Sequence, residues 1–532
     1  MSFYLGIDVG TASVRAGLFD DNGRLIGMSV HPIEIHRPQA DFAEQSSDDI
    51  WQAVRATVRT ALSEAAATGD QVKGIGFDAT CSTVALDDQE RPVTVSPSGD
   101  DRWNVIMWMD HRAGAEADAI NQGRFEFLKH VGGQISLEMH PPKLMWLAKH
   151  LPESYARAVR FLDLPDFLVY RATGRDVRSL CSTGCKQGYL AHEGRWDEPL
   201  YQDAGILDAV HTGKVGREIE PPGKLAGRLT EHAAQELGLS AECAVAVSII
   251  DAHAGAIGCL GAMEDPDACL ALIGGTSACL MALSREPRFV SGVWGPYFGA
   301  VLDGYWLNEG GQSAAGALMD YALEYGPGRL AERARAENRD PYEYANALVA
   351  KLQAGFDPPA SLARHAHVYP DHHGNRSPHA DPRSKGQVDG LTLGADPEDD
   401  AILYYATVQA LAYNARDVIE ALNTKGYRVS SLRVTGGSVK NPVWLQEHAD
   451  ATGCEVIAGE QPEAVLLGSA ILGATASGRF ETVRQGMAAW VRPGETVQPN
   501  PSARAFHDAK FRQFQAMYRQ HLERRKAMDE AR

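Results

Sequence analysis

Cysteine is scarce in this sequence, and no two cysteines stand in a CxxC pair. Eight cysteines are spread over 532 residues, which is typical of reduced thiols in a cytosolic protein rather than of a disulfide framework. Cys181 and Cys185 lie four residues apart, but no second pair completes a zinc site. The first residues, MSFYLGID, enter a predicted strand directly, with no basic leader and no apolar signal-peptide core. We therefore expect a cytoplasmic protein.

Acidic residues outnumber basic ones, and one apolar run alone approaches the length of a membrane span. The net charge is −18, which argues against a nucleic-acid partner because such a partner requires a basic face. Residues 244–263 are apolar for most of their length, but Asp251 and His253 interrupt them, so a buried strand and helix are favoured over a membrane segment. No stretch has the form GxxxxGK, which excludes a P-loop nucleotide site.

The length and the hydrophobic content of 44% suit a globular chain with two large domains of about 250 residues each. The chain is organised around residues 244–283. An apolar run, residues 244–250, ends at Asp251, and a second apolar run breaks at Gly274-Gly275-Thr276-Ser277. A carboxylate at the end of a buried strand indicates either a functional acid or a helix N-cap. Two glycines followed by hydroxyl residues allow backbone N–H groups to face an anion.

A similar hairpin occurs near the N-terminus, in residues 5–20. There Gly10-Thr11 matches Gly275-Thr276, about half the chain away, between two apolar strands of the same design. This repetition indicates a duplicated domain. The two copies differ where Asp8 corresponds to Ile273, so only the first hairpin carries a carboxylate.

Periodicity and turn signals outline the remaining elements. Residues 3–30 predict three antiparallel strands, and Ser46 to Asp49 predict the start of a helix that precedes a strand at 72–77. In the second half, residues 433–435 predict a strand. The predicted helices cover residues 114–122, 141–150, 163–173, 400–422, 441–452 and 462–477. An aromatic stripe in the tail predicts a helix that docks on the body through Phe511, Phe514, Tyr518 and Leu522.

Three motifs occur in the order of one known family. Asp8-x-Gly10-Thr11 with Arg15, the hairpin at 274–277, and TGGSVKNPVWLQEHAD at 435–450 together resemble the FGGY family of carbohydrate kinases. The resemblance covers residues 3–480. It implies an α/β fold of the actin and hexokinase superfamily, with two ribonuclease-H-like domains around a cleft. We expect an N-terminal domain at 1–262, a C-terminal domain at 263–485 and a helical tail at 486–532.

The same resemblance implies ATP and Mg²⁺ as cofactors. Asp8 is expected to hold the magnesium ion through water, and Asp251 to accept the proton of the attacking sugar hydroxyl. The nucleotide is expected to contact both hairpins and two glycine-rich motifs of the second half, through Gly10, Thr11, Arg15, Gly275, Thr276, Gly316, Gly436, Gly437 and Asn441.

The sugar is expected to lie mainly on the first domain. The loop DATCST at 78–83 resembles that of D-ribulose kinases, although an Asx turn at Asp78 explains the loop equally well without the family. Lys186 and Glu309 resemble sugar contacts of ribulose kinases. In the segment WMDHR, Asp110 and Arg112 either touch sugar or pair with each other, and we expect a structural role for Arg112. The predicted substrate contacts are Asp78, Cys81, Lys186, Asp251 and Glu309.

These features predict an enzyme that phosphorylates the terminal C5 hydroxyl of a pentulose, foremost D-ribulose to D-ribulose 5-phosphate. L-ribulose, ribitol and D-xylulose stay open, because Thr83 stands where D-ribulose kinases are expected to have a larger apolar residue. A catalytically silent sugar sensor of the same fold is a second possibility. A metal-dependent hydrolase built on the five histidines of residues 365–379 is a third, disfavoured by the prolines and spacing of that loop. A homodimer is expected by analogy with oligomers in general.

Overall fold

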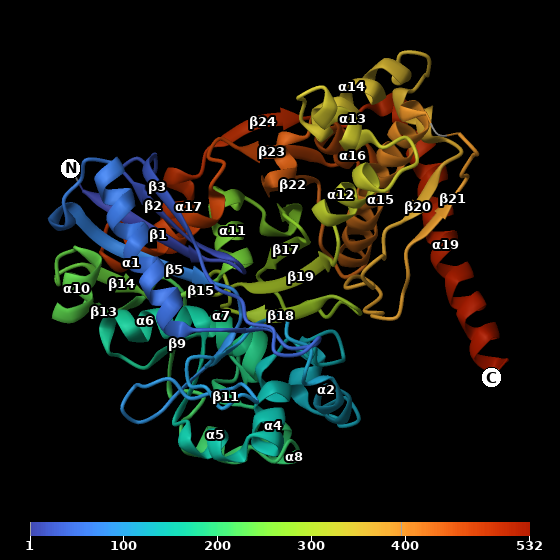
Figure 1. Cartoon of the computed structure of the whole chain (residues 1–532). Coiled ribbons are helices and arrows are strands. Elements are labelled where there is room, and N and C mark those ends of the chain that lie inside the picture. The colour runs from blue at the N-terminus through green and yellow to red at the C-terminus, as the bar shows by residue number, and fades with distance from the viewer. Residues whose placement is uncertain (1, 395, 532) are drawn as a thin grey trace.

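The computed structural model describes residues 2–394 and 396–531, and two large mixed sheets carry its architecture (Figure 1). The first has the order β13-β14-β5-β1-β2-β3, with β15 beside β5, and the second has the order β18-β19-β17-β16-β22-β23-β24. The strands of the first sheet are β1 (Phe3–Val9), β2 (Ser13–Phe19), β3 (Leu25–Pro32), β5 (Val72–Ala79), β13 (Leu225–Arg228), β14 (Ala244–Ala246) and β15 (Ile249–Ile250). Those of the second are β16 (Cys269–Gly274), β17 (Ala278–Ser284), β18 (Trp294–Phe298), β19 (Trp306–Gln312), β22 (Ser431–Gly436), β23 (Glu455–Gly459) and β24 (Pro493–Val497).

Both sheets are built on the same plan. The antiparallel hairpin β1–β2 continues into β3 on one side and pairs in parallel with β5 on the other. The hairpin β16–β17 likewise continues into β19 and pairs in parallel with β22. The predicted α/β class and the predicted duplication are therefore confirmed. The small turn residues between apolar strands produce this local pattern in both halves.

Two helices lie between the sheets. Helix α11 (Asp251–Leu260) packs on β16 and β22, while α17 (Ala464–Ala476) packs on α11 and on β1 and β5. In Figure 1, α17 lies beside the N-terminal strands although more than 380 positions in the numbering separate it from β5. A boundary at residue 262 separates the two sheets, but the packing of α17 crosses it.

Glycines allow this close approach of backbones. A Cβ atom on Gly76 of β5 would stand 1.8 Å from the carbonyl oxygen of Ser469 in α17, and one on Gly258 of α11 would stand 1.8 Å from that of Ala464. Any larger residue would push the helix off the sheet. The position of α17 is therefore tied to glycine at these sites.

The outer faces of the two sheets are covered by amphipathic helices. Helix α1 (Ser47–Glu64) starts where predicted, with the Ser46 hydroxyl capping the N–H of Asp49, and packs on β2 and β3. The second half is covered by α12 (Gly316–Glu324), α13 (Leu330–Ala336), α14 (Pro341–Gln353), α15 (Pro397–Asn423) and α16 (Pro442–Thr452). The helices predicted at 400–422, 441–452 and 462–477 correspond to α15, α16 and α17.

A smaller unit is inserted in the first half, around the sheet β4-β7-β6-β8. Its strands are β4 (Glu44–Gln45), β6 (Thr83–Leu86), β7 (Val105–Ile106) and β8 (Arg160–Asp163). Helices α2 (Gly114–Ile120), α4 (His140–His150) and α6 (Leu164–Thr173) match the predicted ranges. Arg112 is fully buried and pairs with Asp110 and Glu44 at 2.7 Å each, which confirms its structural role.

Short elements complete this half and connect it to the first sheet. They are α3 (Glu126–His130), α5 (Pro152–Arg157), α7 (Leu180–Ser182), α8 (Glu198–Asp203), α9 (Leu207–His211), α10 (Glu231–Leu237), β9 (Val177–Ser179), β10 (Tyr189–Leu190), β11 (Arg195–Trp196) and β12 (Glu218–Glu220). Among the residues that the structure describes, no helix is both long and apolar enough to cross a membrane.

The tail docks as predicted but is not wholly helical. After α18 (Val483–Trp490), strand β24 joins the edge of the second sheet, because its backbone pairs with β23. The final helix α19 (Arg504–Glu530) buries Phe511 and Phe514, and the ring of Phe514 lies 4.8 Å from that of Tyr369. Tyr518 packs at the edge of this aromatic cluster, while Leu522 is half-exposed.

Candidate active site

A cavity of about 300 Å³ lies between the two sheets, lined by both hairpins and by the start of α11. Ten of the predicted site residues line it: Asp8, Gly10, Thr11, Arg15, Cys81, Lys186, Asp251, Gly275, Thr276 and Glu309. These residues come from separate strands, turns and helices of both halves. The fold therefore assembles at one place what the sequence distributes over about 300 positions.

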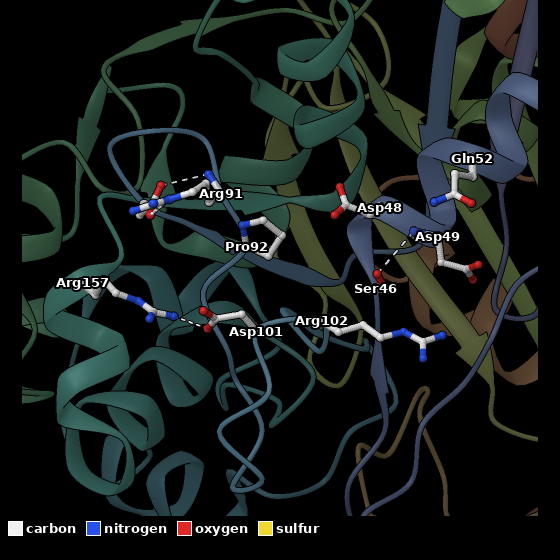
Figure 2. Close-up of a pocket in the computed structure, with 10 residues that line it drawn as sticks. Ser46, Asp48, Asp49, Gln52, Arg91, Pro92, Asp101, Arg102 and Arg157 are labelled. Atoms are coloured by element: carbon white, nitrogen blue, oxygen red, sulfur yellow. Dashed lines mark hydrogen bonds and ion pairs between the residues drawn. The ribbon is translucent and has the colours of Figure 1, made fainter.

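A larger surface hollow of about 770 Å³ lies elsewhere and contains none of the predicted site residues (Figure 2). Several of its charged groups are already paired: Arg91 binds Asp87 at 2.8 Å, and Arg157 binds Asp101. Ser46 is occupied as the cap of α1. The groups that line this hollow stabilise their own loops, so its size alone does not make it the functional site.

The two hairpin turns are similar but close over different lengths, three residues in the first and two in the second. The N–H of Gly10 donates to the carbonyl oxygen of Ser13 at 3.0 Å, and the N–H of Gly275 donates to that of Ser277 at 2.8 Å. Each turn therefore uses its first amide internally and presents its tip to the cavity. The Thr11 hydroxyl accepts a hydrogen bond from the indole of Trp108 at 3.1 Å.

Helix α12 begins directly on the second hairpin. The N–H of Gly316 donates to the carbonyl oxygen of Gly275 at 3.0 Å, and a Cβ atom at Gly316 would lie 2.7 Å from that oxygen. Glycine at this position allows the positive end of the helix dipole to stand beside the turn, an arrangement that favours anions. Gly316 itself does not line the cavity.

Asp251 stands at the first position of α11, directly after β15. One carboxylate oxygen, Oδ1, accepts the N–H of Ala252 at 2.7 Å. Burial, reinforced by the negative charge of Asp8, raises the pKa of Asp251 to about 6. The residue thus serves the start of its helix and presents a carboxylate of increased basicity to the cavity.

Asp8 is buried at the end of β1 and is bound by Arg15. The Nε atom of Arg15 donates to Asp8 Oδ2 at 2.7 Å, and its Nη1 donates to Glu463 at 3.0 Å. Glu463 immediately precedes α17. Arg15 therefore connects the first hairpin to the helix between the sheets.

Asp78 does not line the cavity, contrary to the prediction of a sugar contact. It is the direct parallel partner of Asp8 in the sheet, and Ser469 of α17 donates to its Oδ2 at 2.5 Å. Complete burial and the charge of Asp8 raise the pKa of Asp78 well above its usual value. The strand register turns this side chain toward α17, so it lies behind Asp8.

Lys186 and Glu309 line the cavity beside Trp294, which is the direct strand partner of Glu309. The Lys186 ammonium lies 4.4 Å from the ring centroid of Trp294. Burial disfavours that charge, but Cys81 and Glu309 outweigh it and raise the pKa of Lys186. Burial also opposes ionisation of Glu309, yet Lys186 and a hydrogen bond from His253 lower the pKa of Glu309 to about 2.

Sequence reasoning missed several residues that line the same cavity. They are Glu138, Cys279, Trp294 and Arg376, together with Trp108 of the WMDHR segment. Only Trp108 had a signal, because it stands in a motif that the sequence already singled out. The others lie on loops or strand ends without periodicity, and their proximity depends on tertiary packing.

The predicted adenosine motif lies beside the second hairpin, outside the cavity lining. Gly436 has a φ of 93°, and a Cβ atom there would stand 2.2 Å from the carbonyl oxygen of Gly274. Gly437 has open space in front of it. Asn441 caps α16 by accepting the N–H groups of Val443 and Trp444, at the start of the helix predicted there.

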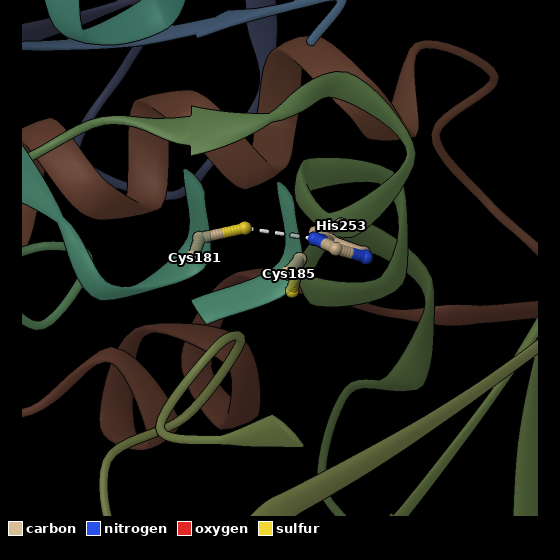
Figure 3. A group of neighbouring side chains, drawn as sticks. All are labelled: Cys181, Cys185 and His253. Atoms are coloured by element: carbon tan, nitrogen blue, oxygen red, sulfur yellow. Dashed lines mark hydrogen bonds between the residues drawn. The ribbon is translucent and has the colours of Figure 1, made fainter. Parts of the chain in front are cut away.

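The histidine-rich loop forms no metal cluster among the described residues. The group with metal-ligand composition is instead Cys181, Cys185 and His253, all buried (Figure 3). Cys181 Sγ lies 2.8 Å from His253 Nδ1. Zinc bound to both atoms would hold them roughly 3.5 Å apart, given bond lengths near 2.3 and 2.0 Å in a tetrahedron. The observed contact is a hydrogen bond.

Two repeated sheets thus direct their hairpin tips at a shared cavity, which the buried carboxylate of Asp251 also lines. Residues 3–258 match the FGGY family of carbohydrate kinases, N-terminal domain, and residues 270–477 match its C-terminal domain. An FGGY carbohydrate kinase domain-containing protein of Homo sapiens is 44% identical, over 96% of this chain and 95% of that protein. A D-ribulokinase of Saccharomyces cerevisiae is 35% identical, over 91% and 73% of the two chains.

The fold also agrees with solved structures. The crystal structure of Plasmodium falciparum glycerol kinase with ADP superposes with a TM-score of 0.78 at 17% identity, covering 98% of each chain. The chain belongs to the FGGY family of carbohydrate kinases. It is an ATP-dependent carbohydrate kinase with the two-domain α/β fold of this family.

Proposed function

We propose that this kinase transfers the γ-phosphoryl group of ATP to the C5 hydroxyl of a pentulose, with D-ribulose as the first candidate. The observation that carries the proposal is the single cavity that joins both hairpins to Asp8, Asp251, Lys186 and Glu309. The D-ribulokinase relative supports D-ribulose. L-ribulose, D-xylulose and ribitol are the competing substrates, since one side chain changes which stereocentre fits.

Asp251 is the general base in this proposal. Phosphoryl transfer needs little covalent chemistry and much positioning, with the acceptor hydroxyl in line with the leaving phosphate. The pKa of about 6 keeps Asp251 ionised at neutral pH while leaving it basic enough to accept a proton. Its free carboxylate oxygen takes the proton of the attacking hydroxyl as the new P–O bond forms.

The carboxylates fit a magnesium ion. Asp8 and Asp251 are two buried acids whose mutual repulsion raises the pKa of Asp251, and Mg²⁺ prefers one or two carboxylates with water and phosphate oxygens. Asp8 would hold the ion. When bound, the ion neutralises charge on the transferring phosphate oxygens. Asp78, behind Asp8, would orient Asp8 by a hydrogen bond in its protonated form.

The nucleotide is assigned to the hairpin tips and the second half of the chain. Thr11 and Thr276 would contact the phosphates through the free amides and hydroxyls of the turns, and Arg15 would support the first turn. The adenosine would lie on the glycine-rich surface beside the second hairpin, which is formed by Gly316, Gly436, Gly437 and Asn441.

The sugar is assigned to the end of the cavity lined by Cys81, Lys186 and Glu309. The sheets would act as an N-terminal domain (1–262) and a C-terminal domain (263–485) that close on the substrates and exclude water. A cytoplasmic location and a homodimer stay predictions, and light scattering on the purified chain tests the second.

A panel of pentuloses and pentitols, assayed by coupled detection of ADP, tests the proposal. We expect ATP turnover that depends on sugar, with the highest kcat/KM for D-ribulose. Equal kcat/KM for all pentuloses would remove the sugar assignment. Sugar binding without any turnover would instead favour a silent sensor of the same fold.

A further inference from the structure

Arg376 reaches the cavity from the loop between β20 (His367–Tyr369) and β21 (Gln387–Asp389), within the histidine-rich segment whose metal role the sequence disfavoured. Its Nη1 atom lies 4.0 Å from Cys279 Sγ, and its guanidinium carbon lies 5.6 Å from the ring centroid of Trp294. Among the described residues, no carboxylate or carbonyl oxygen accepts a hydrogen bond from this side chain. Of the five N–H donors of the guanidinium, only one on Nη1 is used, by Cys279 Sγ, and the others are available to a ligand.

Lys186 approaches the same tryptophan from the first half of the chain. Its ammonium lies 4.4 Å from the Trp294 ring and, within the described residues, donates to no oxygen. Burial disfavours both cations, but Glu138 and Glu309 act on each of them and keep the pKa of Arg376 raised. Cations and carboxylates alternate here, with His253 also bound to Glu309 at 3.2 Å, which suits an uncharged polyhydroxy compound with oxygen atoms that both donate and accept.

Arg376 lies on the side of the cavity to which the sugar is assigned. It shares the Trp294 ring with Lys186, and Trp294 is the direct strand partner of Glu309. A substrate whose phosphorylated end is at Asp251 therefore places its other end near Glu309 and Arg376.

The chemistry of the proposed substrate leaves an acceptor at that end. A pentulose closes its five-membered ring through the C5 oxygen, so a pentulose that presents C5 hydroxyl to phosphate must be open-chain. Its C2 carbonyl is then free and requires a donor when it leaves water. A guanidinium donates to two neighbouring oxygens at once through its planar fork.

We propose that Arg376 is a substrate-binding residue that donates to the C2 carbonyl oxygen and an adjacent hydroxyl of the open-chain pentulose. It thereby favours ketoses over the corresponding pentitols. This inference rests on the proposed function, C5 phosphorylation of a pentulose. Trp294 supports the guanidinium face, and no bond to the arginine is made or broken.

The test compares R376M and R376K with wild type. R383M serves as a matched control because Arg383 is exposed in the same loop and its side chain makes no hydrogen bond or ion pair among the described residues. For each protein, KM and kcat are measured with D-ribulose, L-ribulose and D-xylulose. Ribitol and D-arabinitol are measured as competitive inhibitors against the best pentulose. Thermal denaturation of each variant monitors folding.

We expect R376M to raise the pentulose KM by about 10- to 100-fold, the range of a hydrogen bond to a charged group, with kcat changed less than about threefold. The inhibition constants of the pentitols should rise by a smaller factor than the pentulose KM, since a pentitol keeps its hydroxyl contacts but offers no carbonyl oxygen. The pentulose KM of R376K should lie between those of wild type and R376M, and R383M should have the KM of wild type. If R376M folds poorly, R376K decides the outcome through the same comparison of the change in pentulose KM with the change in pentitol inhibition constant.

Two results would overturn the inference while leaving the kinase assignment intact: an unchanged pentulose KM in R376M, or equal losses for pentuloses and pentitols. Wild-type protein that phosphorylates no pentulose would overturn the proposed function and the inference together. The wild-type panel and the variant ratios therefore separate the two failures.

Discussion

The pH dependence of the reaction tests the environment of Asp251 directly. Burial and the charge of Asp8 raise its pKa from 3.8 to about 6. At pH 5 only about one-tenth of the molecules then hold the ionised base, whereas more than about nine-tenths would do so with an ordinary carboxyl. Because the base must be ionised to accept a proton, kcat/KM should fall about tenfold between its plateau near pH 7.5 and pH 5.

The assay is kcat/KM for the best pentulose between pH 4.5 and 8.5, since this ratio reports the ionisation of the free enzyme. Circular dichroism at each pH shows that the chain stays folded. The variant D251N should lower kcat by about 10²- to 10⁴-fold, the usual contribution of a general base, with KM changed little. Its residual activity should lack the acidic limb.

Two outcomes would contradict this reasoning. A wild-type kcat/KM at pH 5 that stays close to the plateau would show that Asp251 ionises normally or is not the base. An acidic limb that persists in D251N would assign the ionisation to another group.

Three further predictions concern stability. F514A should reduce the free energy of unfolding by about 3–5 kcal/mol because it empties the tail cluster, whereas M528A, at an exposed site, should not; urea unfolding measures both. G76A should lower the free energy of unfolding by about 3 kcal/mol, since its Cβ would stand 1.8 Å from Ser469 O. G114A should leave it nearly unchanged, because a Cβ there meets nothing within 4 Å. Calorimetry compares the Tm values of the two variants. Asp78 has a folded-state pKa well above the model-compound value of 3.8, so its buried acid is more stable protonated and wild type loses stability as pH rises above about 4. The unfolding free energy of D78N should therefore rise relative to that of wild type as the pH is raised from about 4.5 to about 7.5. A difference that stays constant over this range would contradict the raised pKa of Asp78.

Much of the fold followed from local patterns. Apolar runs of strand length that meet at small turn residues predicted the hairpins at Gly10 and Gly275, and helical periodicity predicted α1, α15 and α19. The same local signals led to Asp8 and Asp251, because a carboxylate at the end of a buried strand is unusual without a reason. These features depend on neighbours in sequence, which is why one sequence suffices to find them.

The failures came from contacts between distant segments. Asp78 was expected in the sugar site, but the parallel register of β5 with β1 places it behind Asp8 and under α17. The tail was expected to be helical throughout, but the free edge of the second sheet recruits β24. Strand pairing decided both, and neither pairing partner is adjacent in sequence.

The sequence by itself determined the two hairpins, their glycine turns and the acids beside them, since short-range sterics and alternation of apolar residues specify such elements. Only the tertiary structure decided that Asp8 meets Asp251, that α17 packs on the first sheet, and that Arg376 and Trp294 face Lys186. Packing of backbones through glycine and the burial of charges bring these groups together. Such long-range contacts leave no periodic trace in the loops that supply them.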